Sequence, residues 1–450
     1  MFHDSHGATA LVGMAGFVVG AQALVDGEWW LHVETTASVV DCEDCGSRAV
    51  GHGRIRTPVR DLEISGRPTV LVWAKRRWRC PDPDCGRSTW SERSEQIAPR
   101  AVMTERARKA LAERVNIDGD TIAAAATEFG VGWHTANTAV AEHTDPVIDA
   151  PGRLEGITAI GVDEKRFLNA TPKKRTRFTT QIVGLEGHRV LDVVEGRSRS
   201  VLGDWLIERG EAWCAQIQVA TLDPAAGYRA ALEEHLPNAT LVVDHFHAIK
   251  LANTAIDDVR RRVQQDTLGH RGRKGDPLYR ARRVLLSASE RLSEERFEWM
   301  QSLITAGDPD GEVGAAWVAK ELLRSVYAAT SIAHAKRRLI VFYQHVAEVA
   351  VPELTRLART IERWQEEVLA YHTMGHTSNG RVENLHMLTE KIRRNSHGFT
   401  NITNYRRRIL GRLGTQWDTI PTHRIRGRQP HFIGAEPRIN SPHLGWSNSI

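Results

Sequence analysis

Three short apolar runs in this sequence each lead directly into an aspartate. The runs occupy residues 159–162, 219–222 and 240–243, and they are followed by Asp163, Asp223 and Asp244. Runs of this length are typical of buried strands and are too short for helices. An acid at the end of a core strand is costly unless a cation or a reaction is present there. The three aspartates are therefore candidate metal ligands or catalytic groups.

A fourth acid, Glu383, follows a turn rather than a strand. The Ser-Asn-Gly sequence at residues 378–380 favours a turn, and the pattern after it is helical, so Glu383 lies in the first turn of a predicted helix. Met387 and Leu388 are predicted to bury this helix against the sheet. Carboxylates from separate strands and a helix form an oxygen-rich site suited to Mg²⁺ or Mn²⁺, as two-metal phosphoryl transfer requires. The alternative for Glu383 is a surface acid that complements the helix dipole.

The elements around the aspartates follow the order of an RNase H-like core. Three meandering strands precede a helix, a strand, a helix and a strand; the meander occupies residues 159–163, 177–185 and 188–194. In that order the first and fourth strands are neighbours, so Asp163 and Asp223 are expected to converge. Asp244 ends the next strand outward, about 4.8 Å further away, and is predicted to be an auxiliary acid. His247 is predicted to orient the carboxylates, and a simply packed histidine is the alternative.

Residues 250–371 lack this strand rhythm. They are rich in Ala, Leu, Glu and Arg with helical periodicity, and we interpret them as a helical insertion between the last strand and the helix of Glu383. Basic residues in the insertion could follow a DNA backbone. A purely structural helical bundle is the alternative.

Four of the five cysteines form two close pairs. Cys42 and Cys45 form the first pair and Cys80 and Cys85 the second, with a strand-like segment between the pairs. This spacing is typical of a zinc ribbon with one tetrahedral Zn²⁺, although thiols can also fall in pairs by chance. Such a ribbon needs its metal to fold. Cys214 has no partner and is predicted to be a core residue, and the absence of a disulfide framework favours a cytoplasmic protein.

The apolar stretch at residues 11–25 is too short to span a membrane and contains Gln22. It also lacks the basic leader of a signal peptide. We interpret it as a strand that turns at Asp26 and Gly27 into a second strand at residues 29–36, which gives a hairpin.

Residues 104–144 have the spacing of a helix-turn-helix unit. The third predicted helix, residues 133–143, would enter a DNA major groove, and its candidate base contacts are His134, Thr135, Asn137 and Thr138. This helix is poor in Lys and Arg, so an ordinary three-helix packing module is the alternative. Residues 146–151, which begin and end with proline, are predicted to be a linker.

The net charge of +5 and the pI near 9.0 conceal an uneven distribution of basic residues. Basic clusters lie at residues 75–77, 173–177, 260–262, 393–394 and 406–408. Clusters of this kind suggest a polyanionic partner, with solvated surface faces as the alternative. Together with the acids they favour nucleic acid, and Arg393, Arg394 and Arg406 are candidate phosphate contacts.

Four motifs taken together resemble the ISL-three family of bacterial insertion-sequence transposases, which belongs to the DDE superfamily. They are Gly161-Val-Asp-Glu164, Thr221-Leu-Asp-Pro224 with Tyr228, Val243-Asp-His-Phe-His247, and Ser378-Asn-Gly-Arg-Val-Glu383. The resemblance covers nearly the whole chain and extends to the cysteine ribbon and the helix-turn-helix. It implies an RNase H-like catalytic domain with a helical insertion, and it implies Asp163, Asp223 and Glu383 as a triad that binds two Mg²⁺ or Mn²⁺. His386 stands where the family leads us to expect Asn.

We therefore expect a multidomain α+β protein. The expected divisions are residues 1–100 (hairpin and zinc ribbon), 101–150 (helix-turn-helix), 151–250 and 372–415 (RNase H-like core), 251–371 (helical insertion) and 416–450 (basic tail). The expected function is cleavage of element ends and 3′-OH strand transfer by a homo-oligomer on double-stranded DNA, in the bacterial cytoplasm and at the nucleoid. The alternatives are an RNase H-like nuclease without strand transfer and a zinc-ribbon DNA-binding regulator. These differ in Mg²⁺-dependent chemistry, which the sequence alone does not separate.

Overall fold

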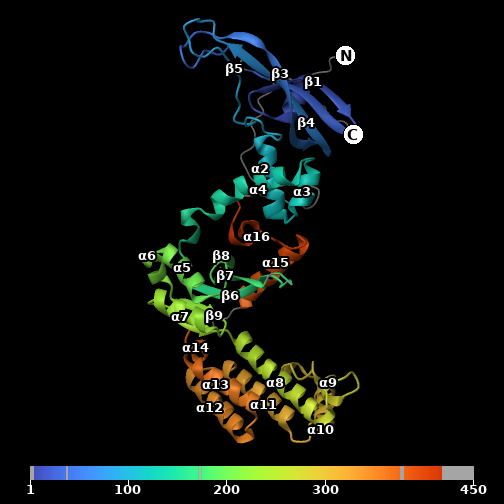
Figure 1. Ribbon diagram of the computed structural model, residues 1–450, viewed down its shortest axis with the longest axis vertical. Coiled ribbons are helices and arrows are strands. Elements are labelled where there is room, and N and C mark those ends of the chain that lie inside the picture. Colours follow the sequence, from blue (N-terminus) through green and yellow to red (C-terminus); the bar gives the residue numbers. More distant parts are fainter. Residues whose placement is uncertain (1–4, 37–38, 171, 174, 375–379, 418–450) are drawn as a thin grey trace, which may run out of the picture. The chain divides into compact units, whose positions relative to one another are not determined.

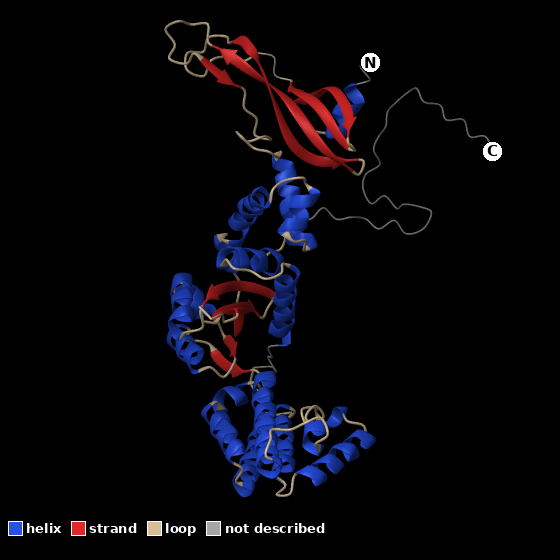
Figure 2. Ribbon diagram, turned by 45° about the vertical axis from the view of Figure 1, so that its right-hand side comes forward, coloured by secondary structure: helices blue, strands red, loops and turns tan. Residues whose placement is uncertain are grey.

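The computed structural model describes residues 5–36, 39–170, 172–173, 175–374 and 380–417. These residues form two five-stranded sheets and sixteen α-helices, all within a unit that spans Met1–Thr415 (Figures 1 and 2). The expected mixed α+β composition is thus confirmed. None of the described helices is long and apolar enough to cross a membrane.

The N-terminal sheet contains the predicted hairpin. Its strands have the spatial order β1-β2-β4-β3 with β5 beside β4, and β2 and β4 are parallel; the elements are α1 (Ser5–Val12), β1 (Phe17–Val25), β2 (Glu28–Thr35), β3 (Val50–Ile64), β4 (Arg67–Arg79) and β5 (Thr89–Ser91). Asp26 and Gly27 join β1 to β2 with positive φ angles of 51° and 88°. Both central residues of a type I′ hairpin turn require such angles, which an Asp-Gly pair supplies.

The prediction that residues 11–16 belong to the first strand is wrong, because residues 5–12 form α1. Ala8 and Val12 are buried in the core of the N-terminal sheet, whereas Leu11 is 70% exposed. Residues four apart share one face of a helix, so this burial pattern suits a helix that packs one side on the sheet. Gly13, at φ 57°, then ends the helix.

Three helices follow the sheet. They are α2 (Glu105–Glu113), α3 (Ile122–Glu128) and α4 (Trp133–Ile148), and Thr104 and Thr121 cap the first two. Gly130, in the short turn between α3 and α4, has φ +62°, and a Cβ there would lie 2.9 Å from Cζ of Arg60. The backbone conformation therefore favours glycine at this turn, whereas the Arg60 side chain could move aside.

The predicted linker at residues 146–151 is also wrong, because α4 continues through Pro146 to Ile148. Proline inside a helix typically costs about 3 kcal/mol. Ile148 is buried in the same core cluster as Val190 and Tyr405, so its packing offsets that cost. A short 3-10 helix, Pro151–Leu154, then leads to the second sheet.

The second sheet has the strand order β10-β9-β6-β7-β8; the strands are β6 (Ala159–Leu168), β7 (Arg177–Gly184), β8 (Arg189–Glu195), β9 (Val219–Leu222) and β10 (Thr240–Val243). β6, β7 and β8 form an antiparallel meander. β9 pairs in parallel with β6, and β10 pairs in parallel with β9. The predicted adjacency of the first and fourth strands is confirmed.

Helices cover both faces of this sheet (Figure 1). On one face, Ile160, Ile182 and Leu191 share a core with buried residues of α5 (Arg199–Arg209), α6 (Glu211–Gln216) and α7 (Ala226–His235). That core includes Cys214, as predicted. On the other face, Val183, Val190 and Val193 pack with buried residues of α15 (Gly380–Asn395) and α16 (Ile402–Ile409). The two faces alternate along each strand, as a pleated sheet requires.

The described residues between β10 and α15 form helices and no strand; the α-helices are α8 (His245–Leu268), α9 (Pro277–Ala281), α10 (Glu294–Gly307), α11 (Glu312–Tyr327), α12 (Ile332–Val349), α13 (Pro352–Arg363) and α14 (Gln365–Ala370). Arg262 of α8 bridges Glu312 and Glu353 at 2.9 Å each. Arg260 is 4% exposed and donates to Gln264 Oε1. Within the basic run at 260–262, Arg262 therefore joins α8 to two other helices, Arg260 is paired within α8, and Arg261 is the most exposed.

α15 begins at Gly380, the last residue of the predicted turn at 378–380; residues 378 and 379 lie outside the described residues. The prediction that Met387 and Leu388 bury the helix is wrong, because they are 69% and 37% exposed. Leu385, His386 and Thr389 are buried instead. The sequence has two helical faces that could be buried here. The face that contains His386 is buried because His386 contacts Asp163 of β6.

Arginines of the predicted basic cluster at 406–408 connect α16 to the three-helix region. Arg407 pairs with Asp145 of α4 at 2.6 Å. Arg408, 3% exposed, donates to the carbonyl oxygens of Val115 and Asp120. Arg406 pairs with Asp192 of β8 at 2.7 Å and with Asp149 at 2.9 Å. These contacts hold α16 against both the sheet and the region around α2 and α4.

The Asp192–Arg406 pair gives a stability prediction. Asp192 is 5% exposed and also accepts from Trp205 Nε1 at 3.0 Å. Burial alone would raise the pKa of Asp192, but Arg406 holds that pKa below its usual range. We expect Asp192→Asn to lower the free energy of unfolding by about 2–4 kcal/mol in a urea titration at pH 7, because it removes one charge of a buried pair.

Asp149→Asn is the matched control, since it removes the exposed partner of the same Arg406 and is expected to cost less than about 1 kcal/mol. Because the folded-state pKa of Asp192 is depressed, the stabilisation is present above the unfolded pKa of about 4 and is lost as the pH falls through the folded value. Equal destabilisation by the two variants would contradict this assignment.

Candidate active site

Asp163 and Asp223 lie side by side on neighbouring strands. β6 does not end at Asp163, as the sequence suggested, but continues to Leu168 in its pairing with β7. What ends there is the parallel pairing with β9, whose last pair is Val162 with Leu222. Asp163 and Asp223 therefore follow the same pair of residues in the two strands, and both line one cavity.

His247, in the first turn of α8, joins the two aspartates. One ligand atom each from Asp163, Asp223 and His247 lies within 4.8 Å of the others. The Nδ1 atom of His247 is 2.9 Å from Oδ1 of Asp223 and 3.4 Å from Oδ2 of Asp244. Two carboxylates and an imidazole at these distances are a donor set that a divalent cation could bind.

Asp244 occupies a different position. It is 1% exposed and caps α8, accepting from the backbone N–H of Phe246 at 3.2 Å. It does not line the cavity that contains Asp163 and Asp223. Its place one strand outward matches the position expected from the sequence.

His386 was noted in the sequence only as a departure from the family pattern, and the structure gives it a specific contact. It lies one turn after Glu383 on α15, and its Nδ1 is 2.6 Å from Oδ2 of Asp163. The His386 side chain is almost completely buried. The signal available in the sequence was its spacing of three residues from Glu383, which places both side chains on one helical face.

A cavity of about 980 Å³ surrounds these groups. Asp163, Asp223, Glu383, His247 and His386 line it together. Basic and apolar side chains complete the lining; they include Lys165, Lys250, Lys391, Arg394, Phe246 and Met387. Lys165 Nζ lies 3.4 Å from Oδ2 of Asp163. We call the other basic lining residues, Lys250, Lys391 and Arg394, the basic border. Acidic and basic groups in one cavity suit a substrate that carries negative charge and needs a cation at its reacting phosphate.

The three candidate phosphate contacts separate in the structure. Arg394 lines the cavity. Arg393 instead donates to the carbonyl oxygens of Arg166 and Phe167, at 3.0 and 3.3 Å. Arg406 is engaged by Asp192 and Asp149 as described above. Of these arginines, Arg394 is the one positioned for a ligand in the cavity.

The carboxyl groups have strongly perturbed proton affinities. Burial alone would raise the pKa of Asp163, but the hydrogen bond and charge of His386 hold that pKa well below its usual range. Burial and the nearby charge of Asp163 raise the pKa of Asp223 to about 6, although His247 opposes the shift. Burial and the charge of Asp244 raise the pKa of Glu383. This mutual repulsion between carboxylates is what a bound divalent cation would relieve.

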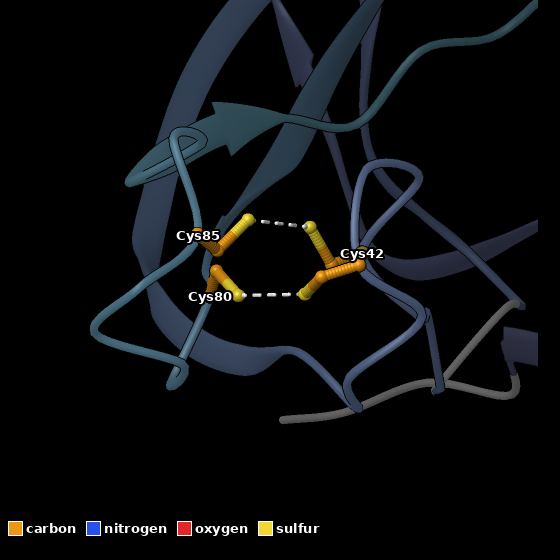
Figure 3. Close-up of side chains that lie close together, drawn as sticks. Cys42, Cys80 and Cys85 are labelled. Carbon is orange, nitrogen blue, oxygen red and sulfur yellow. Dashed lines mark hydrogen bonds between the residues drawn. The ribbon is translucent and has the colours of Figure 1, made fainter.

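The four paired cysteines also converge. The Sγ atoms of Cys42 and Cys85 are 3.7 Å apart, and those of Cys45 and Cys80 are 3.5 Å apart. Figure 3 shows sulfur atoms from the two pairs directed toward one another. A tetrahedral site with Zn–S bonds of about 2.3 Å places sulfurs about 3.8 Å apart, so the four thiols fit Zn²⁺. The loops that carry them follow β2 and β4.

The candidate base contacts on α4 differ in exposure. His134 and Thr138 are exposed, whereas Thr135 and Asn137 are half-buried. The Oδ1 atom of Asn137 is buried without a hydrogen-bond partner. His134 and Thr138 are therefore the residues of this group that face solvent most freely.

These features define a zinc-ribbon protein with an acid-lined cavity on a mixed sheet. A family model described as transposase, the DDE family ISL3, matches residues 160–409. A second model, described as the zinc-finger of transposase IS204/IS1001/IS1096/IS1165, matches residues 38–85. The chain belongs to the ISL3 family of DDE transposases, which confirms the resemblance seen in the sequence.

Two curated relatives support this membership. The transposase for insertion sequence element IS1001 of Bordetella parapertussis is 25% identical over 377 residues, which are 82% of this chain and 87% of that protein. The transposase for insertion sequence element IS1557 of Mycobacterium tuberculosis is 25% identical over 292 residues, 60% of this chain and 63% of that protein. Membership of this family and the zinc ribbon imply that the chain binds DNA.

Proposed function

We propose that this protein binds the ends of an insertion sequence and catalyses metal-dependent DNA cleavage followed by 3′-OH strand transfer. The observation that carries the proposal is the convergence of Asp163, Asp223 and Glu383 on one cavity with a basic border. They come from two neighbouring strands and a helix more than a hundred residues later in the chain. The alternation of the sheet and its helices supports an RNase H-like core for residues 151–250 and 372–415.

The residues present fit a pair of divalent ions such as Mg²⁺ or Mn²⁺. Asp163, Asp223 and His247 each offer one ligand atom within 4.8 Å of the others, and these donors are carboxylate oxygens and an imidazole nitrogen. Two such ions, when bound, activate a water or a 3′-OH and stabilise the leaving oxygen of a phosphodiester.

The surrounding side chains have separate tasks in this proposal. His386 holds the Asp163 carboxylate in one orientation through its 2.6 Å contact. Lys250, Lys391 and Arg394 bind phosphates on either side of the reacting group. Asp244 fixes the start of α8, and therefore the position of His247, as an auxiliary acid.

DNA binding is proposed to be divided between regions. The zinc ribbon and α3–α4 would recognise element ends, and the cavity border would bind the backbone, with a homo-oligomer assembled on DNA. Replacing His134 and Thr138 together by Ala should reduce the preference for end sequence over random duplex by about tenfold or more, as expected when base contacts are lost. Binding to random duplex should persist and fall steeply with salt.

Point substitutions suit this measurement better than removal of residues 1–148. Arg408 donates to backbone oxygens at Val115 and Asp120, so a truncated chain would leave a buried guanidinium without partners. Replacing Thr127, exposed on α3 and bonded to its own helix, by Ala is the matched control. Unchanged discrimination in the His134 and Thr138 double variant would contradict the assignment of α4.

The proposed reaction is tested by a strand-transfer assay. The full chain is incubated with a labelled end duplex that carries a free 3′-OH, a target plasmid, and Mg²⁺ or Mn²⁺. Covalent joining of label to plasmid is expected. Cleavage without joining would indicate a nuclease on the same fold, and end binding without any metal-dependent cleavage would indicate a regulator.

A further inference from the structure

His247 and Asp223 are in close contact at the first turn of α8. Nδ1 of His247 lies 2.9 Å from Oδ1 of Asp223 and 3.4 Å from Oδ2 of Asp244. Burial would lower the pKa of His247, but hydrogen bonds to Asp223 and Asp244 raise it to about 9, so without a metal this contact is an imidazolium–carboxylate pair. Loss of the Nδ1 proton would leave a lone pair directed at the same acids.

A divalent cation between these groups would take the place of that proton. Asp163 places a further oxygen within 4.8 Å of both atoms, which completes a group of three donors from β6, the end of β9 and α8. His386 is the competing imidazole, and its Nε2 is buried without a partner. Its Nδ1, however, already contacts Asp163 at 2.6 Å, and His386 is not part of the convergent group. The geometry favours His247 as the ligand and His386 as a positioning residue.

We propose that His247 is a direct metal ligand together with Asp163 and Asp223, which makes this a mixed carboxylate and imidazole site. The inference rests on the metal-dependent function proposed above. Imidazole suits first-row transition ions, whereas Mg²⁺ prefers oxygen ligands with several waters. The site therefore binds Mn²⁺ more tightly than Mg²⁺, by about tenfold or more.

Electron paramagnetic resonance of Mn²⁺ tests this ligand set without an activity measurement. Mn²⁺ is added to the full-length protein with its four-cysteine site loaded with zinc, and the electron spin echo is examined for modulation by ¹⁴N. Modulation from one class of nitrogen is expected, and it should change when the histidines are labelled with ¹⁵N. The thiolates of the zinc site contribute no such nitrogen signal.

Three variants locate the nitrogen. His247→Gln should abolish the modulation and weaken Mn²⁺ binding by at least about 10–100-fold, the range known for residues that support a metal site. His245→Gln is the matched control, because its ring lies 6.0 Å from those of Tyr327 and Tyr371 and it is outside the convergent group. His386→Gln should also retain the modulation. Loss in His386→Gln with retention in His247→Gln would overturn the assignment.

His247→Asp keeps the test decisive if the glutamine variant folds poorly. It restores an oxygen ligand, so Mn²⁺ should bind without nitrogen modulation and the preference for Mn²⁺ over Mg²⁺ should diminish. Mn²⁺ bound to the wild type without any nitrogen modulation would refute a role for His247 as ligand and leave the carboxylate site intact. Failure of the wild type to bind Mn²⁺ at all would refute the proposed function as well.

Discussion

Asp163→Asn, Asp223→Asn and Glu383→Gln should each reduce metal-dependent cleavage of an end duplex by on the order of 10³-fold or more, the scale seen when a catalytic group is removed. Each change keeps the size of the side chain and removes its charge. The three carboxylates line one cavity, so the loss of any one removes an anionic ligand from the same pair of metal ions. DNA binding measured by gel shift should survive, because the basic border of the cavity is unchanged.

Asp244→Asn is the matched control for this series. Asn caps helices about as well as Asp, and Asp244 caps α8 without lining the cavity, so the variant should retain measurable cleavage. If Asp244→Asn is inactive while Asp223→Asn still cleaves, the assignment of the second carboxylate must be reversed. Circular dichroism of each variant establishes that the fold is retained.

Cys80→Ser should remove stoichiometric zinc and unfold the N-terminal sheet, while the catalytic core remains folded. Cys80 follows β4 directly, and its Sγ lies 3.5 Å from the Sγ of Cys45 in the other cysteine pair. Structural Zn²⁺ binding contributes on the order of 10–16 kcal/mol to the folding of small zinc domains. We therefore expect the remaining interactions of this region to be too weak to keep it folded without the metal. Metal analysis and limited proteolysis measure the two effects separately.

Cys214→Ser is the control for the ribbon, because Cys214 lies in the core beside α5 and is not part of the four-thiol group. It should keep one zinc per chain. Protein purified without chelators that contains no stoichiometric zinc would contradict the ribbon assignment. Selective digestion of residues before α2 in Cys80→Ser would support it.

The sequence predicted those parts of the fold that local patterns control. The Asp26–Gly27 pair predicted a hairpin, and the apolar runs of four residues correspond to β9 and β10. The order of elements then implied that Asp163 and Asp223 are neighbours, as the strand pairing confirms. These features depend on residues close together in the chain or on a few topological rules.

Other features depended on contacts that no local pattern contains. Residues 146–151 begin with a proline and are predicted to be a linker, yet α4 continues past Pro146 to the buried Ile148. Met387 and Leu388 were assigned to the core because they are apolar, but the contact of His386 with Asp163 turns α15 the other way. In both cases a tertiary contact outweighs local propensity.

The basic clusters show the same limit. A run of arginines carries no information about the acids and carbonyl groups that it will meet in the folded chain. Arg262 and Arg407 form ion pairs between helices, whereas Arg394 reaches the cavity. Charge alone thus predicted the class of partner and could not assign each arginine to it.

The arginines of α16 have a consequence for the geometry of the reaction. Through Arg407 and Arg408 they fix the α2–α4 region to the same C-terminal segment whose preceding helix carries Glu383 and His386. If α4 reads bases at an element end, the number of base pairs between that reading and the phosphate in the cavity is set by the protein. The contacts of Arg407 and Arg408 then fix the distance between the bases that are read and the phosphate that is cut. Inserting one base pair within the element end would therefore shift the cut by one nucleotide.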